Sequence, residues 1–206
     1  MRIGMVIDID KCTACQACTI ACCSENNLPK GIQRTNIYPI GPKGKFPNVS
    51  MQFVSMGCMQ CDDAPCVKVC PIKATYMRED GIVIQDNDKC MGCKYCMTAC
   101  PYEARNFNKY APFTEEYDEK PEFINPSSSL SPRHTIEKCD FCSHRQDASD
   151  GIAATACVVA CPSEARYIGD LDDPNSEINQ LIRRKHAQPL RPEQKTKPKV
   201  YYVWDK

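Results

Sequence analysis

The chain has 206 residues, enough for one large or two small domains, and its 26 basic and 26 acidic residues balance, so its charge does not point to nucleic acid. No run of 18 apolar residues predicts a membrane span, and the apolar stretch at the N-terminus is too short for a secretory signal. Hydrophobic residues make up 42%, but 17 of these residues are cysteines, so about a third of the chain is left for an ordinary core. We therefore expect bound metal to contribute to the folding free energy, and its loss to unfold the protein.

The first cysteine group follows a short apolar stretch, residues 6–11, that predicts a strand. Its spacing is Cys-x2-Cys-x2-Cys-x3-Cys, given by Cys12, Cys15, Cys18 and Cys22. Moving residues 8–22 by 78 positions superposes them on residues 86–100, with the acidic residues, the lysine and the cysteines in register. This match indicates an internal repeat.

Two further groups occupy the middle of the chain. Residues 24–57 are rich in proline and glycine, with one strand expected at residues 49–54. The second group then contains Cys58, Cys61, Cys66 and Cys70, and the third contains Cys90, Cys93, Cys96 and Cys100. Between them, residues 76–84 predict a hairpin in which Asp80-Gly81 supplies the positive φ angles of a two-residue turn.

The last group follows an insertion, residues 106–138, which is too long for an ordinary connection and predicts either a flexible loop or a surface ordered by a partner. The group contains Cys139, Cys142, Cys157 and Cys161. Beyond it, residues 172–177 predict a helix start with Pro174 in the first turn, and the helix should end near Lys185. The tail carries eight basic residues from position 183 onward and ends in a strand expected at residues 200–204.

The spacing of the third group, closed by Pro101, is that of bacterial ferredoxins, in which the fourth cysteine of a run binds the neighbouring cluster. Three closely spaced thiolates point into one concavity, and the x3 step carries the fourth sulfur one helical turn away. Four groups therefore predict four [4Fe–4S] clusters with exchanged fourth ligands. The predicted ligand sets are Cys12, Cys15, Cys18 and Cys161 (set a); Cys58, Cys61, Cys66 and Cys100 (set b); Cys90, Cys93, Cys96 and Cys70 (set c); and Cys139, Cys142, Cys157 and Cys22 (set d).

These sets predict an α+β fold with little regular secondary structure, made of two nested bacterial-ferredoxin-like units. The inner unit is residues 58–101. The outer unit is residues 1–57 plus 102–206, with the insertion 106–138 and the tail 167–206, and its two cysteine groups must meet in space. Neighbouring clusters with exchanged ligands lie close enough for electron tunnelling, so the spacing by itself favours an electron relay.

Two other uses of the cysteines are less consistent with the spacing. A disulfide framework gives no reason for x2 and x3 steps in four groups, and four-cysteine zinc sites need no third cysteine followed by Cys-Pro.

Cys23 is left over and fits a small buried apolar residue or an alternative ligand. Lys11, Lys89 and Lys138 each precede a first ligand, where a cation would raise the cluster potential, although each also fits a solvated strand end. The sequence contains no phosphate loop, nucleophile with a base, or other substrate site.

The four groups, together with phrases such as 57–61, 90–96, 138–142 and 169–171, resemble the iron–sulfur electron-transfer subunits of the dimethyl sulfoxide reductase family of molybdenum or tungsten enzymes, of the polysulfide, thiosulfate or arsenate reductase type. In some relatives a tryptophan replaces one cysteine of the third group, whereas all four are present here. The first group lacks the proline that would follow Cys22.

The resemblance implies a non-catalytic subunit that relays electrons in anaerobic respiration. Its partners would be a catalytic subunit holding molybdopterin guanine dinucleotide and a quinone-linked membrane subunit or a cytochrome. It also implies a location on the periplasmic side, after export with the catalytic subunit, with a cytoplasmic location as the alternative. The rival function is a soluble polyferredoxin that acts alone, but such a carrier has no need of residues 106–138 and 167–206.

Overall fold

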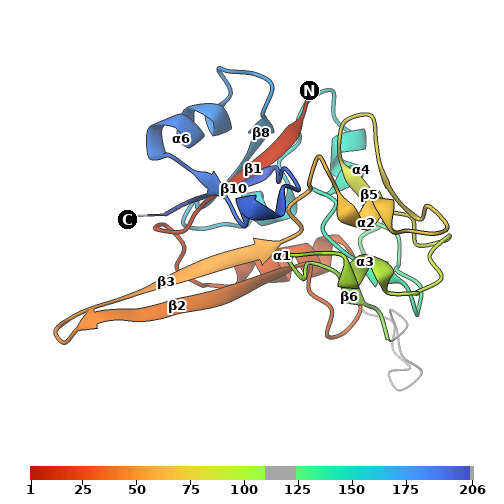
Figure 1. The fold of residues 1–206 in the computed structure, drawn as a ribbon, viewed down its shortest axis with the longest axis horizontal. Helices are drawn as coiled ribbons and strands as arrows, with labels where there is room; N and C mark the ends of the chain where they lie inside the picture. Colours follow the sequence, from red (N-terminus) through yellow and green to blue (C-terminus); the bar gives the residue numbers. More distant parts are fainter. Residues whose placement is uncertain (110–123, 205–206) are drawn as a thin grey trace.

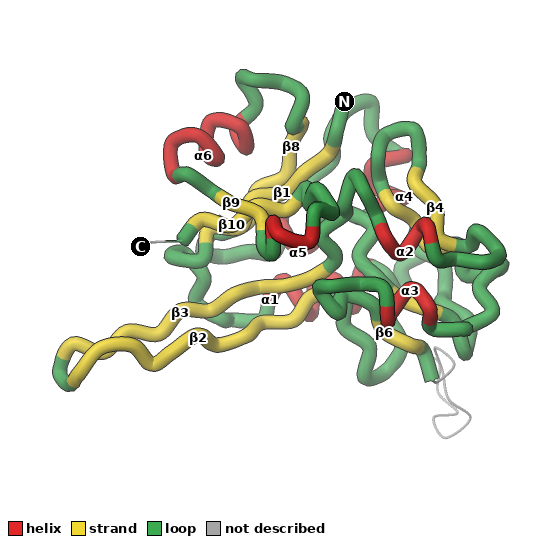
Figure 2. Tube along the Cα trace, viewed as in Figure 1, coloured by secondary structure: helices red, strands yellow, loops and turns green. Residues whose placement is uncertain are grey.

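The computed structural model describes residues 1–109 and 124–204. Short strands and helices lie among loops, and one long hairpin extends from the body (Figures 1 and 2). The strands are β1 (Ile3–Asp8), β2 (Thr35–Lys45), β3 (Asn48–Gly57), β4 (Thr75–Met77), β5 (Val83–Gln85), β6 (Asn106–Phe107), β7 (Ile136–Glu137), β8 (Arg166–Asp170), β9 (Gln188–Pro189) and β10 (Val200–Val203). The helices are α1 (Ala17–Glu25), α2 (Pro65–Lys68), α3 (Tyr95–Thr98), α4 (Ser143–Asp147), α5 (Ala156–Val159) and α6 (Glu177–Lys185), with a 3-10 turn η1 (Pro192–Gln194). The fold is a mixture of α and β with little regular secondary structure, as predicted.

The main sheet joins the two ends of the chain. Its strand order is β8-β1-β10-β9, with β1 parallel to β10 and antiparallel to β8. Every residue of β1 is buried, which explains its almost continuous apolar sequence. The strand lies three residues before the predicted 6–11, because the Asp8 carboxylate accepts the backbone N–H of Asp10 and turns the chain. The strand predicted at 200–204 is confirmed as β10.

Helix α6 packs beside the main sheet (Figure 1). Ile178 and Leu181 are buried in a cluster with Val6 and Val203 from β1 and β10. The helix ends at Lys185, as predicted, but it begins at Glu177. The hydroxyl of Ser176 accepts the backbone N–H of the third helical residue, 3.4 Å away, and so places Pro174 before the helix instead of in its first turn.

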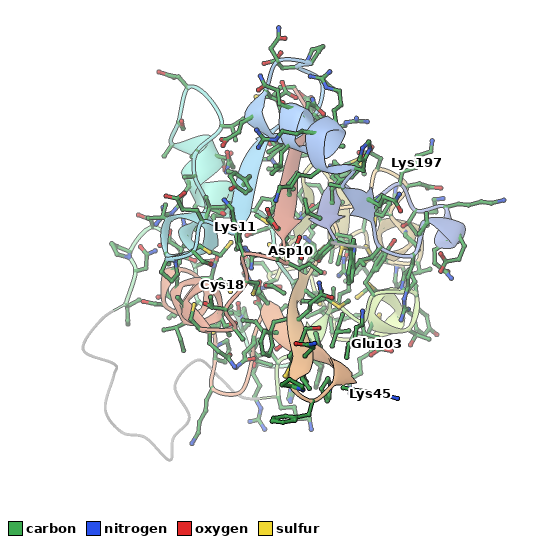
Figure 3. All side chains as sticks on the ribbon, turned by 90° about the vertical axis from the view of Figure 1, so that its left-hand side faces the viewer. Asp10, Lys11, Cys18, Lys45, Glu103 and Lys197 are labelled. Carbon is green, nitrogen blue, oxygen red and sulfur yellow. The ribbon has the colours of Figure 1, made fainter. Side chains whose placement is uncertain are left out.

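The long hairpin is formed by β2 and β3, and only β3 was expected from the sequence. Ile40 and Lys43 flank an irregularity in the pairing, where β2 contains a Gly-Pro pair. Prolines and glycines usually argue against a strand, but in a two-stranded ribbon every strand is an edge and tolerates them. The outer half of the hairpin is exposed and carries Lys45 and Phe46, and Figure 3 looks toward its tip.

The hairpin expected at residues 76–84 is present as β4 and β5, but its turn differs from the prediction. The backbone N–H of Arg78 donates to the carbonyl of Ile82 at 2.9 Å, so three residues form the loop. Of the three loop residues, 79–81, only Gly81 has a positive φ, 79°. The turn is therefore the three-residue type with glycine in the left-handed position, not a two-residue turn.

The insertion at residues 106–138 begins and ends inside the protein. β6 pairs with β7, and Ile136, Glu137 and Lys138 are buried. Asn125 is tied to the end of α1, since its side chain donates to the carbonyl of Glu25 at 2.7 Å. Residues 110–123 lie outside the described residues, so the choice between a loop and a partner-ordered surface concerns only the centre of the insertion.

The tail after α6 crosses the residues around the second cysteine group. The backbone N–H of Lys199 donates to the carbonyl of Met59 at 2.9 Å, and the carbonyls of Thr196 and Lys197 accept the backbone N–H groups of Asp63 and Asp62. The basic tail thus ties the end of the chain to its middle. Within the described part of the chain, no helix combines the length and hydrophobicity needed to cross a bilayer.

Candidate metal centres

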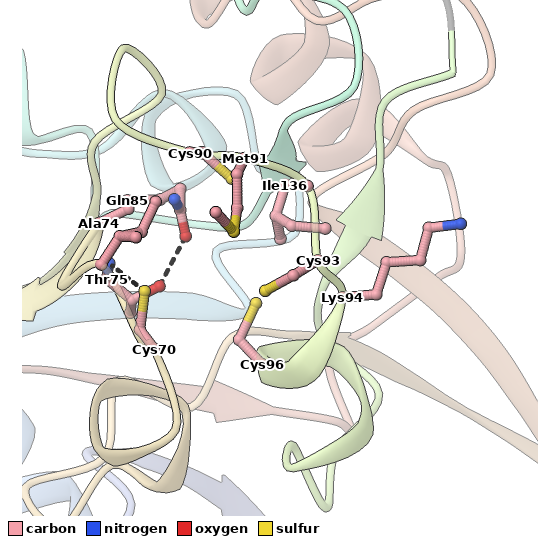
Figure 4. Close-up of a pocket in the computed structure, with 12 residues that line it drawn as sticks. Cys70, Ala74, Thr75, Gln85, Cys90, Met91, Cys93, Lys94, Cys96 and Ile136 are labelled. Carbon is pink, nitrogen blue, oxygen red and sulfur yellow. Dashed lines mark hydrogen bonds between the residues drawn. The ribbon is translucent and has the colours of Figure 1, made fainter.

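Three cavities are each lined by four cysteines. In each, three cysteines come from one group and the fourth comes from another group. The first cavity contains Cys12, Cys15, Cys18 and Cys161; the second contains Cys58, Cys61, Cys66 and Cys100; the third, shown in Figure 4, contains Cys70, Cys90, Cys93 and Cys96. These combinations coincide with the sets a, b and c expected from the spacing.

The four cysteines of set d are also neighbours. Burial raises the pKa of the Cys22 thiol well above its ordinary value, and the nearby thiols of Cys139, Cys157 and Cys142 raise it further. Thr155 contacts the sulfur of Cys157 at 3.2 Å. The structure therefore brings Cys22, at the end of the first group, to the last group 117 residues or more away.

Short helices position the third cysteine of every group. Cys18, Cys66, Cys96 and Cys157 lie at the start of α1, α2, α3 and α5, and all four are buried. In the last three of these groups the helix ends before the fourth cysteine, whereas in α1 the fourth cysteine, Cys22, lies inside the helix. This arrangement follows the x3 spacing, which places two side chains one helical turn apart.

The loops before these helices share an unusual backbone conformation. The residue preceding the second cysteine of each group has a positive φ; these residues are Ala14 (57°), Gln60 (47°), Gly92 (70°) and Phe141 (54°). Such left-handed residues turn successive backbone N–H groups to one side, and this forms a concavity that favours an anion. Only one of the four is a glycine, so the pattern is not visible in the sequence.

The cavities suit a group larger than one ion. Across residues 1–109 and 124–204, no three His, Cys, Asp or Glu side chains converge closely enough to hold a single metal ion. A zinc ion would need all four sulfurs about 2.3 Å from one point. In each cavity the four thiols instead line one shared wall, and such a set fits an iron–sulfur cube, in which each of four irons takes one thiolate.

The thiols are held in surroundings that disfavour the free thiolate. Burial raises the pKa of both Cys61 and Cys142 to about 12, and it also raises the pKa of Cys139. A metal ligand must be deprotonated, so binding at these sites releases protons and is driven by the metal. Cys161 is an exception, because N–H and hydroxyl groups, including the backbone N–H of Ala165 at 3.3 Å from its sulfur, outweigh burial and lower its pKa.

The three lysines that precede first ligands have different surroundings. The Lys11 ammonium donates to the hydroxyl of Tyr167 at 2.7 Å. Lys89 is 66% exposed and forms an ion pair with Asp86 at 2.6 Å. Lys138 is 2% exposed, and its ammonium donates to the carbonyls of Val83 and Cys139. Because solvent and a carboxylate screen Lys89, we expect Lys138 to have the larger effect on any nearby cluster.

The side chains of Cys23 and His144 contact groups outside the cysteine cavities. The sulfur of Cys23 contacts the carbonyl of Ile32 at 3.7 Å, and Cys23 lines none of the three cavities described above. His144 lies 2.7 Å from a carboxylate oxygen of Glu25. Cys23 thus fits a half-buried apolar residue, the simpler of its two interpretations.

Two buried arginines at the cavities were missed in the sequence analysis. Arg105 lines the cavity of set b and Arg166 lines the cavity of set a. Each follows a Cys-Pro-x-x-Ala repeat. The third copy of the repeat has Thr75 at this position, and comparing the repeats one residue further would have shown the two arginines.

The chain is similar to known iron–sulfur proteins. The model of the 4Fe-4S dicluster domain matches residues 49–116. The arsenate respiratory reductase iron–sulfur subunit of Shewanella sp. strain ANA-3 is 41% identical over 98% of this chain and 96% of its own length. A selenate reductase subunit of Mesobacillus selenatarsenatis is 43% identical, over 97% of this chain and 70% of its own. The iron–sulfur cluster-binding subunit of menaquinone reductase from Nitratidesulfovibrio vulgaris is 38% identical, over 98% and 89%.

These relatives are subunits of reductases, two of them named as iron–sulfur subunits, and each match covers 97% or 98% of this chain. The match confirms the electron-transfer function expected from the cysteine groups. The chain belongs to the family of iron–sulfur electron-transfer subunits of the molybdopterin reductases.

Proposed function

We propose that this chain holds four [4Fe–4S] clusters, one in each of the sets a to d, and relays electrons between two partner proteins. The observation that carries the proposal is that three cavities are each lined by four cysteines, with the fourth supplied by another group. The clusters, when bound, take up and release single electrons. The protein holds the thiolates, excludes water and sets the surrounding charge.

The two nested units, residues 58–101 within 1–57 plus 102–206, give the proposed relay its order. Sets c and b are neighbours, since α2, which carries Cys66, contacts α3, which carries Cys96. Sets b and d are joined where the side chain of Gln60 donates to the carbonyl of Cys139 at 2.6 Å. Sets d and a meet where α5, with Cys157, contacts α1, with Cys18. We infer the order c, b, d, a.

The ends of this order lie at the surface. Cys93 of set c and Cys15 of set a are exposed, and they are equivalent in the 78-residue repeat. Met91 and Tyr95 beside Cys93 are also more than half exposed. Electrons would therefore enter and leave at opposite ends of the relay.

We infer the partners from the relatives. Their names describe subunits of arsenate, selenate and menaquinone reductases, so we propose a catalytic subunit that carries molybdopterin guanine dinucleotide, with molybdenum or tungsten. A quinone-linked membrane subunit or a cytochrome would be the second partner. We propose a periplasmic location, which the chain reaches together with the catalytic subunit. Protease added to spheroplasts, whose outer membrane has been opened, should degrade the protein if it is periplasmic. The protease should leave the protein intact if it is cytoplasmic.

Native purification tests the function. Anaerobically prepared protein should contain about sixteen iron atoms per chain, as four cubes require, and should remain bound to a molybdenum or tungsten protein. An isolated monomer would favour a free polyferredoxin, and zinc without iron would favour a structural zinc protein.

A matched pair of variants tests the ligand assignment. Cys22→Ser should lose about four iron atoms, because Cys22 is the exchanged ligand of set d. Cys23→Ser changes the adjacent residue and should keep all the iron. Equal iron contents in the two variants would contradict the assignment.

A further inference from the structure

Arg105 and Arg166 occupy the same position in two repeats. Each is the residue after Cys-Pro-x-x-Ala, so one arginine follows the third cysteine group and one follows the fourth. Both are buried, with 4% and 7% of their surface exposed. A guanidinium stays charged at every physiological pH, so each of these two positions holds a buried positive charge.

Arg105 has neutral hydrogen-bond partners. It donates to the hydroxyl of Thr75 at 3.2 Å and to the side-chain oxygen of Gln85 at 3.0 Å. Its second terminal nitrogen, Nη2, is buried and has no partner among the described residues. The same side chain lines the cavity that contains Cys58 and Cys66.

Arg166 repeats this arrangement at the cavity of set a. It donates to the hydroxyl of Ser55 at 2.6 Å and lies 3.6 Å from the sulfur of Met5. Its Nε is buried and has no partner within the described part of the chain. It lines the cavity that contains Cys12 and Cys18.

A third arginine, the half-buried Arg34, has the carboxylate partners that these two lack. Arg34 lies 2.7 Å from Glu137 and 3.2 Å from Asp140, so two carboxylates balance its charge. Within residues 1–109 and 124–204, no carboxylate lies within ion-pair distance of Arg105 or Arg166. An unpaired buried charge is costly, so an anion is needed in each cavity.

Each arginine also lies near a second cysteine set. Thr75 and Gln85, which accept the hydrogen bonds from Arg105, line the cavity of set c. Arg166 is the first residue of β8, which contacts α5, the helix that carries Cys157 of set d. Arg105 therefore lies between sets b and c, and Arg166 lies between sets a and d.

We propose that Arg105 is the shared counter-charge of the clusters in sets b and c, that Arg166 is the shared counter-charge of those in sets a and d, and that each raises the reduction potentials of its own pair. The proposal rests on the proposed function, because the clusters are the anions. A cluster gains negative charge on reduction, so a nearby buried cation stabilises the reduced state. The potentials of the relay would thus be set two at a time.

Redox titration of the anaerobically purified complex, followed by electron paramagnetic resonance, tests the proposal. Arg105→Gln should lower two of the four potentials, and Arg166→Gln should lower the other two. We expect the equilibrium constant for reduction to fall about tenfold, which is about 59 mV for one electron. Arg105→Lys and Arg166→Lys keep the charge and should stay close to the wild type, and Lys89→Gln removes an exposed, paired charge and should shift nothing.

Gln85→Glu gives a second test that leaves Arg105 in place. The new carboxylate would pair with the guanidinium that donates to Gln85 in the wild type, so the potentials affected by Arg105→Gln should fall in this variant as well. It also decides the matter if Arg105→Gln does not take up iron.

Unchanged potentials in iron-replete Arg105→Gln or Gln85→Glu would overturn the proposal. So would overlapping pairs of shifted signals for Arg105→Gln and Arg166→Gln, or equal effects of the Gln and Lys variants. Failure of the proposed function looks different, since the wild type itself would then lack about sixteen iron atoms and four one-electron signals.

Discussion

The left-handed residues of the cysteine loops show how backbone conformation and close contacts restrict the residue type at a single position. Gly92 has a φ of 70°, and a Cβ atom there would overlap the carbonyl oxygen of His134. Alanine would therefore be strained in its backbone conformation and would also push against a neighbouring chain segment. The other three loops use non-glycine residues at this point, so the close contact is the feature that specifically requires glycine.

Gly92→Ala should destabilise the protein by about 3 kcal/mol and reduce the iron bound at set c. Gly151→Ala is the matched control, because a Cβ at Gly151 would meet nothing within 4 Å. Iron analysis and thermal unfolding under anaerobic conditions measure both effects. Similar results for the two variants would rule out the steric explanation.

Glu25 gives a prediction about pH. It joins α1 to α4, and the hydrogen bond from Arg145 is the main cause that lowers its pKa from 4.5 to about 2, with His144 contributing. A lowered pKa in the folded state stabilises the protein fully above the ordinary pKa, and this stabilisation is lost as the pH falls from 4.5 toward 2.

We expect Glu25→Gln to cost about 2 kcal/mol at pH 7, and the difference from the wild type to shrink below about pH 4.5. Thermal unfolding at a series of pH values measures this difference. Glu79→Gln, at an exposed carboxylate, is the control and should change stability little. A difference that grows on acidification would contradict the assignment.

At the level of single residues, the spacing predicts the same groups of four cysteines that line the three cavities. The steps of two and three residues determine which three sulfurs share a loop and which sulfur lies one helical turn away. Few combinations of four cysteines are then able to bind one cluster. The positive φ values of Ala14 and Gln60 follow from the loop and not from residue type. Arg105 and Arg166 were missed because a single arginine in a charged sequence attracts no notice until its burial is known.

Among the elements, the β2–β3 hairpin has two parts that contribute differently to the stability of the protein. Its base enters the core, where Val54 is 3% exposed, while Val49 on the same strand is 51% exposed. An isolated two-stranded ribbon is marginally stable in water, so the base holds the outer half in place.

Val54→Ala should destabilise the protein by about 2 kcal/mol, because it removes two buried methyl groups and leaves a small cavity. Val49→Ala makes the same chemical change where water already reaches the side chain, and it should change stability by less than about 0.5 kcal/mol. Denaturant unfolding of the two variants compares them directly. Equal losses would mean that the outer half also contributes to the core.

The elements with strong local signals were predicted well. α6, β3 and β10 have apolar periodicity or clear boundaries, and they lie close to the predicted positions. β2 was missed because its prolines and glycines hide an edge strand. β9 has two residues and exists only through its pairing with β10, which no local pattern reveals.

For the whole molecule, the cysteines form part of the larger hydrophobic core cluster of the described residues. That cluster includes Cys18, Cys61, Cys66, Cys96 and Cys157 together with residues of β1 and β10. Metal ligands are thus mixed with the apolar side chains that would otherwise hold the fold, so binding and folding are coupled.

Removing iron with a chelator under anaerobic, reducing conditions should therefore unfold the chain in one cooperative step. Circular dichroism would measure the loss of secondary structure, and adding iron and sulfide back should restore it. Iron-free protein that keeps its native spectrum would contradict the coupling.

The path of the chain also determines when each part can be completed during synthesis. β1 lies between β8 and β10, and the first cavity joins cysteines at positions 12 and 161. Residues 200–203 must therefore be synthesised before β1 can complete its sheet, whereas the cysteines of positions 58–100 are all available much sooner. Before residue 161 is made, the three cysteines at positions 12, 15 and 18 lack the fourth cysteine of their cavity.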